Sequence, residues 1–131
     1  NNISDISPLS ELNKLQELSL NHNNISNLSP ISGLTNLKEL TLSYNDISDI
    51  TPLSELSKLK TLLLYLNDIS DIQPLIENFK VKENGNTIGL GEGDTVKLQH
   101  NKLDLSEGSK DLKDIQTLLD RGVEVEFYPQ K

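Results

Sequence analysis

Residues 45–67 read NDISDITPLSELSKLKTLLLYLN, and this stretch decides the fold because most of it recurs at a fixed interval. One 22-residue period separates Asn45 from Asn67, and the same interval leads back to Asn23 and Asn1. The interval also relates four prolines, which are Pro8, Pro30, Pro52 and Pro74. The register holds from residue 1 to about residue 76 without a slip, so the chain is expected to stack one structural unit repeatedly.

Each unit carries the pattern L-x-x-L-x-L-x-x-N, which in the quoted stretch is Leu59, Leu62, Leu64 and Asn67. In the L-x-L part, strand alternation turns both leucines inward and leaves the residue between them on the opposite face. Two earlier units contain the same pattern, at Leu15, Leu18 and Leu20 and at Leu37, Leu40 and Leu42. One short strand per unit predicts a parallel sheet along a solenoid of the α/β class.

The recurring asparagine and proline also have physical reasons. The chain turns after each strand, and a turn inside a solenoid leaves buried backbone groups without partners in the sheet. An asparagine amide both donates and accepts, so a column of Asn23, Asn45 and Asn67 is expected to satisfy these groups. Proline fixes φ and lacks an N–H, which suits the first position of a short helical turn on the convex side.

The unit N-x-I-S-D-I-x-P-L-x-x-L-x-x-L-x-x-L-x-L, taken from residues 45–64, resembles the 22-residue internalin-type repeat of bacterial leucine-rich-repeat proteins. The resemblance covers residues 1–76, and the tail from Gly91 resembles the terminal cap of similar proteins. It implies a right-handed solenoid with a parallel concave sheet, short helical or 3-10 turns on the convex face and a C-terminal helix–strand cap. It also implies a secreted or cell-surface bacterial protein that binds other proteins through the concave sheet.

We expect one leucine-rich-repeat domain over residues 1–131, made of regular repeats (1–76), an irregular fourth repeat (77–105) and a C-terminal cap (106–131). In the fourth repeat the stretch from Pro74 to Asn101 is longer than the equivalent stretch from Pro52 to Asn67. The 12 extra residues are expected to form a loop or a small hairpin that turns at Asn84-Gly85.

A change of spacing near the C-terminus predicts the cap. Leu112, Ile115, Leu118 and Leu119 are spaced as one face of a helix, and Gly122 follows its end. A last strand is indicated by the alternation of Val123, Val125 and Phe127. Such a cap keeps an apolar face and an open strand edge away from water. Because no similar device precedes Asn1, further repeats upstream and self-association through the uncapped N-terminal edge are expected.

Composition argues against several classes of partner. Twenty Asp and Glu residues against twelve Lys and Arg residues give a net charge of −8, which repels nucleic acids and anionic membrane surfaces. No apolar run approaches the roughly 20 residues of a membrane-spanning helix. Cysteine is absent, so the chain offers neither a thiol nucleophile nor a thiolate ligand. We therefore expect a protein partner, no cofactor and no membrane insertion.

Residues that flank the inward leucines are expected to line the concave face in columns, one residue per unit. Tyr44, Leu63, Tyr65 and Leu66 stand out, because the repeat itself does not require apolar or aromatic residues there. The alternative is that Leu66 and Tyr44 only pack beside their neighbours, and that Glu17 and Glu39 form a solvated face instead of an acidic flank to the patch. The candidate partner-binding residues are Glu17, Ser19, Glu39, Thr41, Tyr44, Thr61, Leu63, Tyr65, Leu66 and Lys97.

Histidines and aspartates are the remaining candidates for a metal site. His22 and His100 hold equivalent positions in the first and fourth strands, so three inter-strand steps separate them by roughly 14 Å, too far for one ion. Asp5, Asp49 and Asp71 form a convex column that either attracts calcium or caps the following turn. The cap is favoured, since the alternating acids of a calcium loop are missing. No catalytic, cofactor-binding or metal residue is assigned.

Two functions are consistent with these observations. In the first, the chain is a protein–protein interaction module that binds a macromolecular partner through the concave sheet. In the second, it is a rigid spacer or targeting arm of a larger surface protein or enzyme, whose activity lies outside this segment. The segment itself is not expected to be an enzyme.

Overall fold

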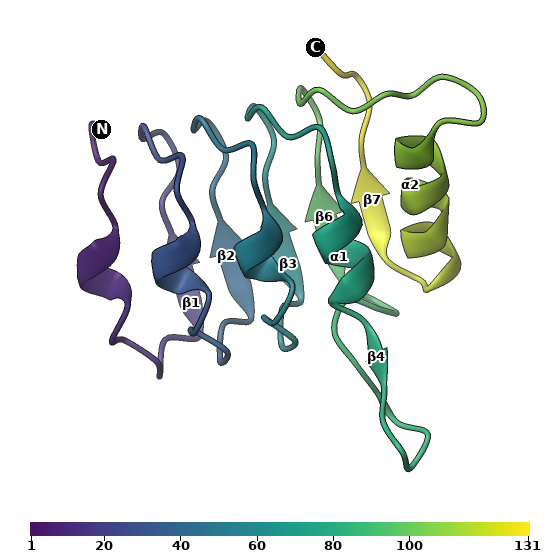
Figure 1. The fold of residues 1–131 in the computed structure, drawn as a ribbon, viewed down its shortest axis with the longest axis horizontal. Coiled ribbons are helices and arrows are strands. Elements are labelled where there is room, and N and C mark those ends of the chain that lie inside the picture. The colour runs from purple at the N-terminus through teal and green to yellow at the C-terminus, as the bar shows by residue number, and fades with distance from the viewer.

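The computed structural model describes residues 1–131 and shows a solenoid with a parallel sheet on one face and short helices on the other (Figure 1). The five-stranded sheet contains, in spatial order, β1 (Glu17–Ser19), β2 (Glu39–Thr41), β3 (Thr61–Leu63), β6 (Thr95–Lys97) and β7 (Glu124–Glu126). The opposite face carries the 3-10 helices η1 (Ser7–Leu9), η2 (Ser29–Ile31) and η3 (Thr51–Leu53), and the α-helices α1 (Gln73–Glu77) and α2 (Lys110–Asp120). None of these helices combines the length and apolar character needed to cross a membrane.

The 22-residue interval of the sequence is the strand register of the sheet. Leu18 pairs with Leu40, and Leu40 pairs with Leu62. The register continues beyond the regular repeats, since Leu62 pairs with Val96 and Val96 pairs with Val125. The predicted α/β solenoid with a concave parallel sheet and convex turns is therefore confirmed.

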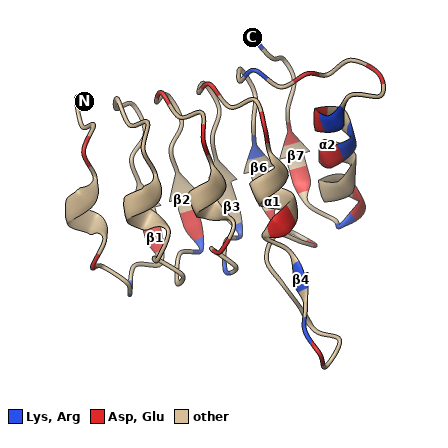
Figure 2. Ribbon diagram, in the orientation of Figure 1, with Lys and Arg blue, Asp and Glu red and all other residues tan.

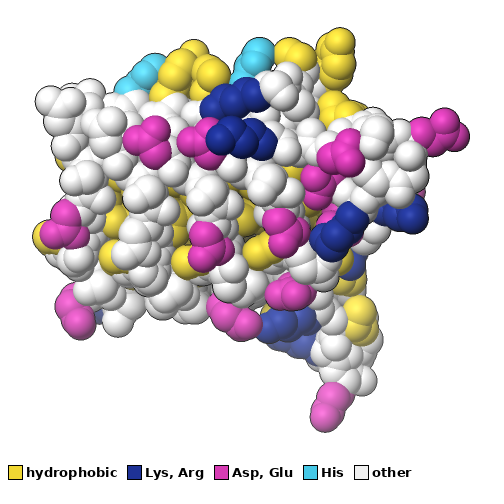
Figure 3. All heavy atoms as spheres, turned by 45° about the horizontal axis from the view of Figure 1, so that its top comes forward, with side chains coloured by type: hydrophobic (Ala, Val, Ile, Leu, Met, Phe, Trp, Pro, Cys, Tyr) yellow, Lys and Arg dark blue, Asp and Glu magenta, His cyan; other side chains and the backbone are white.

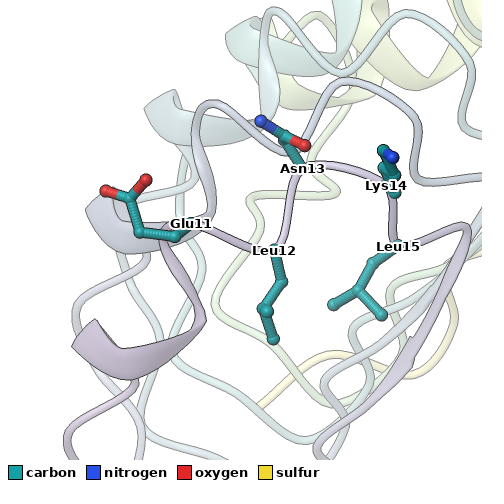
Figure 4. Close-up of a pocket in the computed structure, with 5 residues that line it drawn as sticks. All are labelled: Glu11, Leu12, Asn13, Lys14 and Leu15. Atoms are coloured by element: carbon teal, nitrogen blue, oxygen red, sulfur yellow. The ribbon is translucent and has the colours of Figure 1, made fainter.

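A single apolar core runs the length of the solenoid and is built almost entirely of leucine and isoleucine. Most of its side chains are fully buried, but at the β1 end Leu15 and Leu18 are only partly covered. Ile3 and Leu12 are 44% and 46% exposed at the same end. A hollow of 420 Å³ lies there, lined by residues 11–15, with the side chains of Leu12 and Leu15 on one side of the chain (Figure 4). The core is thus open to solvent beside β1.

An asparagine ladder closes the turn after each strand, as the sequence predicts. The Nδ2 of Asn67 donates to the carbonyl oxygens of Leu42, at 3.0 Å, and Leu64, at 3.1 Å. Its Oδ1 accepts from the N–H of Ile47, at 3.0 Å. Asn45 and Asn101 make the equivalent bonds in their own turns. Each amide thus joins two neighbouring units, and its hydrogen bonds offset the cost of its own burial.

The convex column of acids and Asn27 caps the short helices. Asp49 Oδ1 accepts from the N–H of Thr51 at 2.9 Å, and Asn27 accepts from Ser29 at 3.0 Å in the same geometry. Asp5 and Asp71 accept equivalent bonds. The interpretation of this column as a cap is therefore correct. The prolines lie at the second residue of each helix, one position later than the sequence pattern predicted, because the capped residue comes first.

The insertion in the fourth unit forms a hairpin, one of the two forms that the sequence predicts. β4 (Lys80–Val81) and β5 (Thr87–Ile88) pair antiparallel and project from the edge of the solenoid (Figure 1). Asn78 fixes the base of the hairpin: its Nδ2 donates to the carbonyl of Leu56 at 2.9 Å, and its Oδ1 accepts from Leu90 N–H at 2.8 Å. Gly89 has φ +91° beside this asparagine, and a Cβ there would lie 2.1 Å from the carbonyl oxygen of Asn78. The close approach requires glycine.

Helix α2 and strand β7 cover the last repeat, as predicted. Ser109 caps α2 by accepting from the N–H of Leu112 at 3.1 Å. One detail of the predicted helix face was wrong: Leu119 is 38% exposed, whereas Asp111 is buried. Asp111 tolerates burial because its Oδ2 accepts the N–H of Asp104 at 2.9 Å. The buried face of α2 is thus formed by Asp111, Ile115 and Leu118.

Candidate functional site

Four residues on the rim of the concave face adopt a left-handed backbone conformation. They precede the ladder asparagine in successive units: His22, Tyr44, Leu66 and His100, with φ of 60°, 59°, 56° and 57°. This conformation is relaxed for glycine and asparagine, but it costs other residues on the order of 1 kcal/mol each. The repeat needs the turn, but it does not need bulky side chains there. Backbone strain at such positions is typical of functional surfaces.

The rim side chains and their neighbours form a continuous row. The rings of His22 and Tyr44 stack with centroids 4.0 Å apart, and Tyr44 meets Tyr65 edge to face at 5.4 Å. Such pairs hold flat side chains in fixed positions at a small entropic cost. Hydrophobic side chains and histidines gather along this edge of the molecule in the space-filling view (Figure 3).

The C-terminal segment adds a fifth turn to this surface. Gln130 replaces the ladder asparagine: its Nε2 donates to the carbonyls of Leu98, at 2.9 Å, and Phe127, and its Oε1 accepts from the N–H of Leu103, at 3.1 Å. Tyr128 and Pro129 therefore occupy the two positions before the ladder residue. They continue the columns of Tyr65 and Leu66, respectively.

Tyr128 and Pro129 were missed as site residues from the sequence, although a signal was present. Val125-x-Phe127-x-x-Gln130 matches L-x-L-x-x-N in spacing, with a longer amide in place of asparagine. The last unit does not follow the 22-residue interval, because the spacing from Asn101 to Gln130 is longer than 22 residues. Searching for the amide spacing within the unit, without requiring the interval, would have found it.

A groove of 380 Å³ lies along the rim between β3 and the C-terminal segment. Tyr128 at one end is 77% exposed and Tyr44 at the other end is 42% exposed. We call this feature the rim groove and define it by its lining residues, which are Tyr44, Tyr65, Leu66, Lys97, Gln99, His100, Glu126, Tyr128 and Pro129.

Polar groups of the rim groove are concentrated around Glu126. Its carboxylate accepts from Gln99 Nε2 at 2.5 Å and lies 3.6 Å from the ammonium of Lys97. Gln99 Oε1 has no partner among the protein atoms. The neighbouring column is acidic as well, with Glu17, Glu39 and Glu124 on paired strands. Figure 2 shows these acidic positions on β1, β2 and β7.

The residues predicted for the concave face do not all meet in one place. Tyr44, Tyr65, Leu66 and Lys97 line the rim groove. Outside the groove, further along or across the sheet, lie Glu17, Ser19, Glu39, Thr41, Thr61 and Leu63. The apolar patch predicted from the sequence therefore extends toward the C-terminal segment, where the groove is, and Leu63 stands beside it on β3.

Three carboxylates, those of Asp71, Asp111 and Asp114, approach one another within 4.8 Å on the convex side. The ammonium of Lys110 lies among them, 2.6 Å from Asp114 and 3.3 Å from Asp71. A backbone hydrogen bond from Gln73 and the ammonium of Lys110 lower the pKa of Asp71. This cluster is accounted for by a lysine counter-ion and by the helix cap.

Comparison with known proteins gives consistent matches. The family model of leucine-rich repeats (two copies) matches residues 13–55 and 35–77. The solved structure of internalin C2 from Listeria monocytogenes is similar with a TM-score of 0.73 and 34% identity, over 95% of this chain and 47% of that chain. Internalin F from the same organism gives 0.74 and 29%, over 98% of this chain and 34% of that chain. The chain thus spans less than half the length of either, and no curated protein sequence matches it.

Proposed function

Because the chain belongs to the bacterial leucine-rich-repeat proteins of the internalin type, we propose that it is a module that binds a protein partner through its concave face and rim groove. It does so as part of a secreted or cell-surface protein, and it has no enzymatic activity of its own. The concave columns and the groove together offer a continuous surface along five strands.

The left-handed rim is the observation that carries this proposal. At four successive units the turn holds a histidine, a tyrosine or a leucine where glycine or asparagine would be relaxed. Those side chains do not fill the core, because His22 and Tyr44 are exposed and Leu66 and His100 are half-buried. A binding surface explains why they are retained at a cost in stability.

The residue types agree with those of protein interfaces. Tyrosine is enriched at the centres of such interfaces, where its ring is buried and its hydroxyl finds a partner. All three tyrosines of the chain line the rim groove. Two of them are exposed, Tyr44 by 42% and Tyr128 by 77%, and Tyr65 is half-buried.

Chemical crosslinking on the surface of the source bacterium or its host, followed by affinity measurements with the purified partner, tests the proposal. We expect Tyr44→Ala combined with Tyr65→Ala to weaken that partner at least tenfold, as for interface hot spots. The matched control is Val81→Ala, which removes an exposed apolar side chain from the hairpin, away from the groove.

Equal affinity of the double variant and the control would show that the partner binds outside the rim groove, and the absence of any crosslinked protein would favour the spacer function. Sedimentation of the purified chain separately tests self-association through the open edge of β1. Dimers that dissociate on Leu12→Ser would support it, and a monomer at all concentrations would exclude it.

A further inference from the structure

We propose that the rim groove accepts an arginine side chain of the protein partner, an inference that rests on the proposed function and specifies its chemistry. Three features support it: aromatic side chains along the groove, an accessible carboxylate that is only weakly paired with a lysine, and an acidic surround. Each belongs to residues already placed in the groove or on the strands beside it.

The walls of the groove suit a planar group. Tyr65 and Tyr128 belong to the same column with Gln99 between them, so two inter-strand steps, about 9.6 Å, separate their backbones. Aromatic rings attract a cation to their faces, and guanidinium, which is planar and weakly hydrated, stacks on them better than ammonium. The groove therefore offers aromatic rings that a cationic side chain can contact.

The carboxylate of Glu126 can accept hydrogen bonds from a further donor in the groove. Glu126 accepts from Gln99 and faces Lys97 at 3.6 Å, yet both charged side chains remain accessible, at 55% and 36%. Exposed pairs of this kind are weak, so an entering guanidinium can replace Lys97 and bind the carboxylate with two parallel bonds.

Charge over the concave face is complementary to a cation. The outward columns of the five strands hold the carboxylates of Glu17, Glu39, Glu124 and Glu126 against the single ammonium of Lys97. A carboxylate of the partner would be repelled by this face. An aromatic or proline side chain would cover Glu126 without providing a donor, which costs the desolvation of a charge.

Tyrosine fluorescence gives a direct test, because the protein has no tryptophan and its three tyrosines all line the groove. The probe is acetyl-Gly-Gly-Arg-Gly-Gly-amide, and the comparison peptides carry lysine, citrulline or phenylalanine in place of arginine. We expect saturable binding of the arginine peptide in the millimolar range, weaker binding of lysine, and none of citrulline, whose shape is similar but whose charge is zero. Affinity should fall as salt concentration rises.

Two variants with opposite expected effects sharpen the test. Glu126→Gln should weaken the arginine peptide about threefold, whereas Lys97→Gln, which removes the competing ammonium, should strengthen it about twofold. Glu124→Gln is the matched control: it removes the same charge from the same strand and the same acidic face but lies outside the groove, so it should weaken the peptide less. Circular dichroism checks that each variant is folded.

Equal binding of the arginine and citrulline peptides, tighter binding of the phenylalanine peptide, or equal effects of Glu126→Gln and Glu124→Gln would overturn the proposal. The outcome is separable from that of the proposed function. If Tyr65→Ala still weakens the crosslinked partner while the arginine peptide does not bind, the module binds protein by other chemistry. If the partner ignores every groove variant, the binding surface itself is wrong.

Discussion

Gln130 donates its side-chain amide to the carbonyl oxygen of Leu98 at 2.9 Å, in the way that Asn101 donates to Leu64 in the turn before. The terminal segment therefore ends as a repeat ends, and its last residues hold Tyr128 and Pro129 in the rim groove. The cap and the candidate binding surface share one set of hydrogen bonds.

We expect Gln130→Ala to destabilise the fold by about 1–3 kcal/mol, because the part-buried N–H of Leu103 loses its acceptor and the carbonyl of Leu98 loses a donor. Urea denaturation measures the change. Gln116→Ala is the control, since the amide of Gln116 bonds only the exposed Asp120 on α2. Equal midpoints for the two variants would show that the amide of Gln130 contributes nothing to the turn.

The strained rim gives a comparison between two leucines. Leu66 has φ +56° and Leu63 lies in β3, and both are half-buried. Asparagine is relaxed in the left-handed region but disfavoured in strands. We expect Leu66→Asn to cost about 1 kcal/mol less folding free energy than Leu63→Asn, as measured by thermal and urea unfolding, while it weakens partner binding. A larger loss of folding free energy for Leu66→Asn than for Leu63→Asn would show that the backbone of Leu66 is not strained.

Acid should destabilise the protein through its helix caps. Hydrogen bonds from the Thr51 side chain and N–H lower the pKa of Asp49 below 3.8. A carboxylate whose pKa is lowered in the folded state stabilises the fold at pH values above its unfolded pKa. This contribution is lost as the pH falls through the folded pKa. Desolvation raises the pKa of Asp94, whose contribution has the opposite sign. More aspartates have a lowered pKa than a raised one, so acid should destabilise the fold overall. The aspartates with a lowered pKa are Asp5, Asp49, Asp68, Asp71 and Asp104.

Asp49→Asn tests whether the carboxylate caps cause the acid sensitivity, because Asn27 makes the same cap without a charge. The urea midpoint of the variant should match that of the parent near neutral pH and fall less steeply below pH 3.8. Parallel pH profiles for the two proteins would assign the acid sensitivity to other groups.

Gly89→Ala should destabilise the fourth unit by more than about 2 kcal/mol, because a Cβ would lie 2.1 Å from the carbonyl oxygen of Asn78 and φ is +91°. Gly85→Ala, at φ +85° in the hairpin turn with open space around it, isolates the conformational part, about 1 kcal/mol. Hydrogen exchange of the Leu90 N–H, which donates to Asn78, locates the effect. Similar losses for both variants would argue against the steric contact.

Most of the fold could be predicted because each repeat position has one physical reason. The inward leucines follow from strand alternation, and Asn67 follows from the unpaired groups of a buried turn. The rim groove could not be predicted in the same way. It forms where His100 of an insertion-bearing unit meets Pro129 of an irregular last unit, and no fixed interval relates them.

The spacing of apolar residues alone also could not predict which side chains of the cap helix α2 are exposed. Leu119 has the position of a core residue on a regular helix, but it is 38% exposed, whereas Asp111 is buried and accepts the N–H of Asp104. A buried carboxylate with its own donor cannot be recognised from periodicity, since its partner lies in the preceding loop.

The hairpin of the fourth unit loops out 12 additional residues while the pairing of Leu62 with Val96 continues as if they were absent. Chain length at the hairpin turn, between Val81 and Thr87, is thereby uncoupled from the sheet, whereas Asn78 and Gly89 hold the base of the hairpin. A reporter peptide grafted at this turn should therefore leave the spacing of the concave face unchanged.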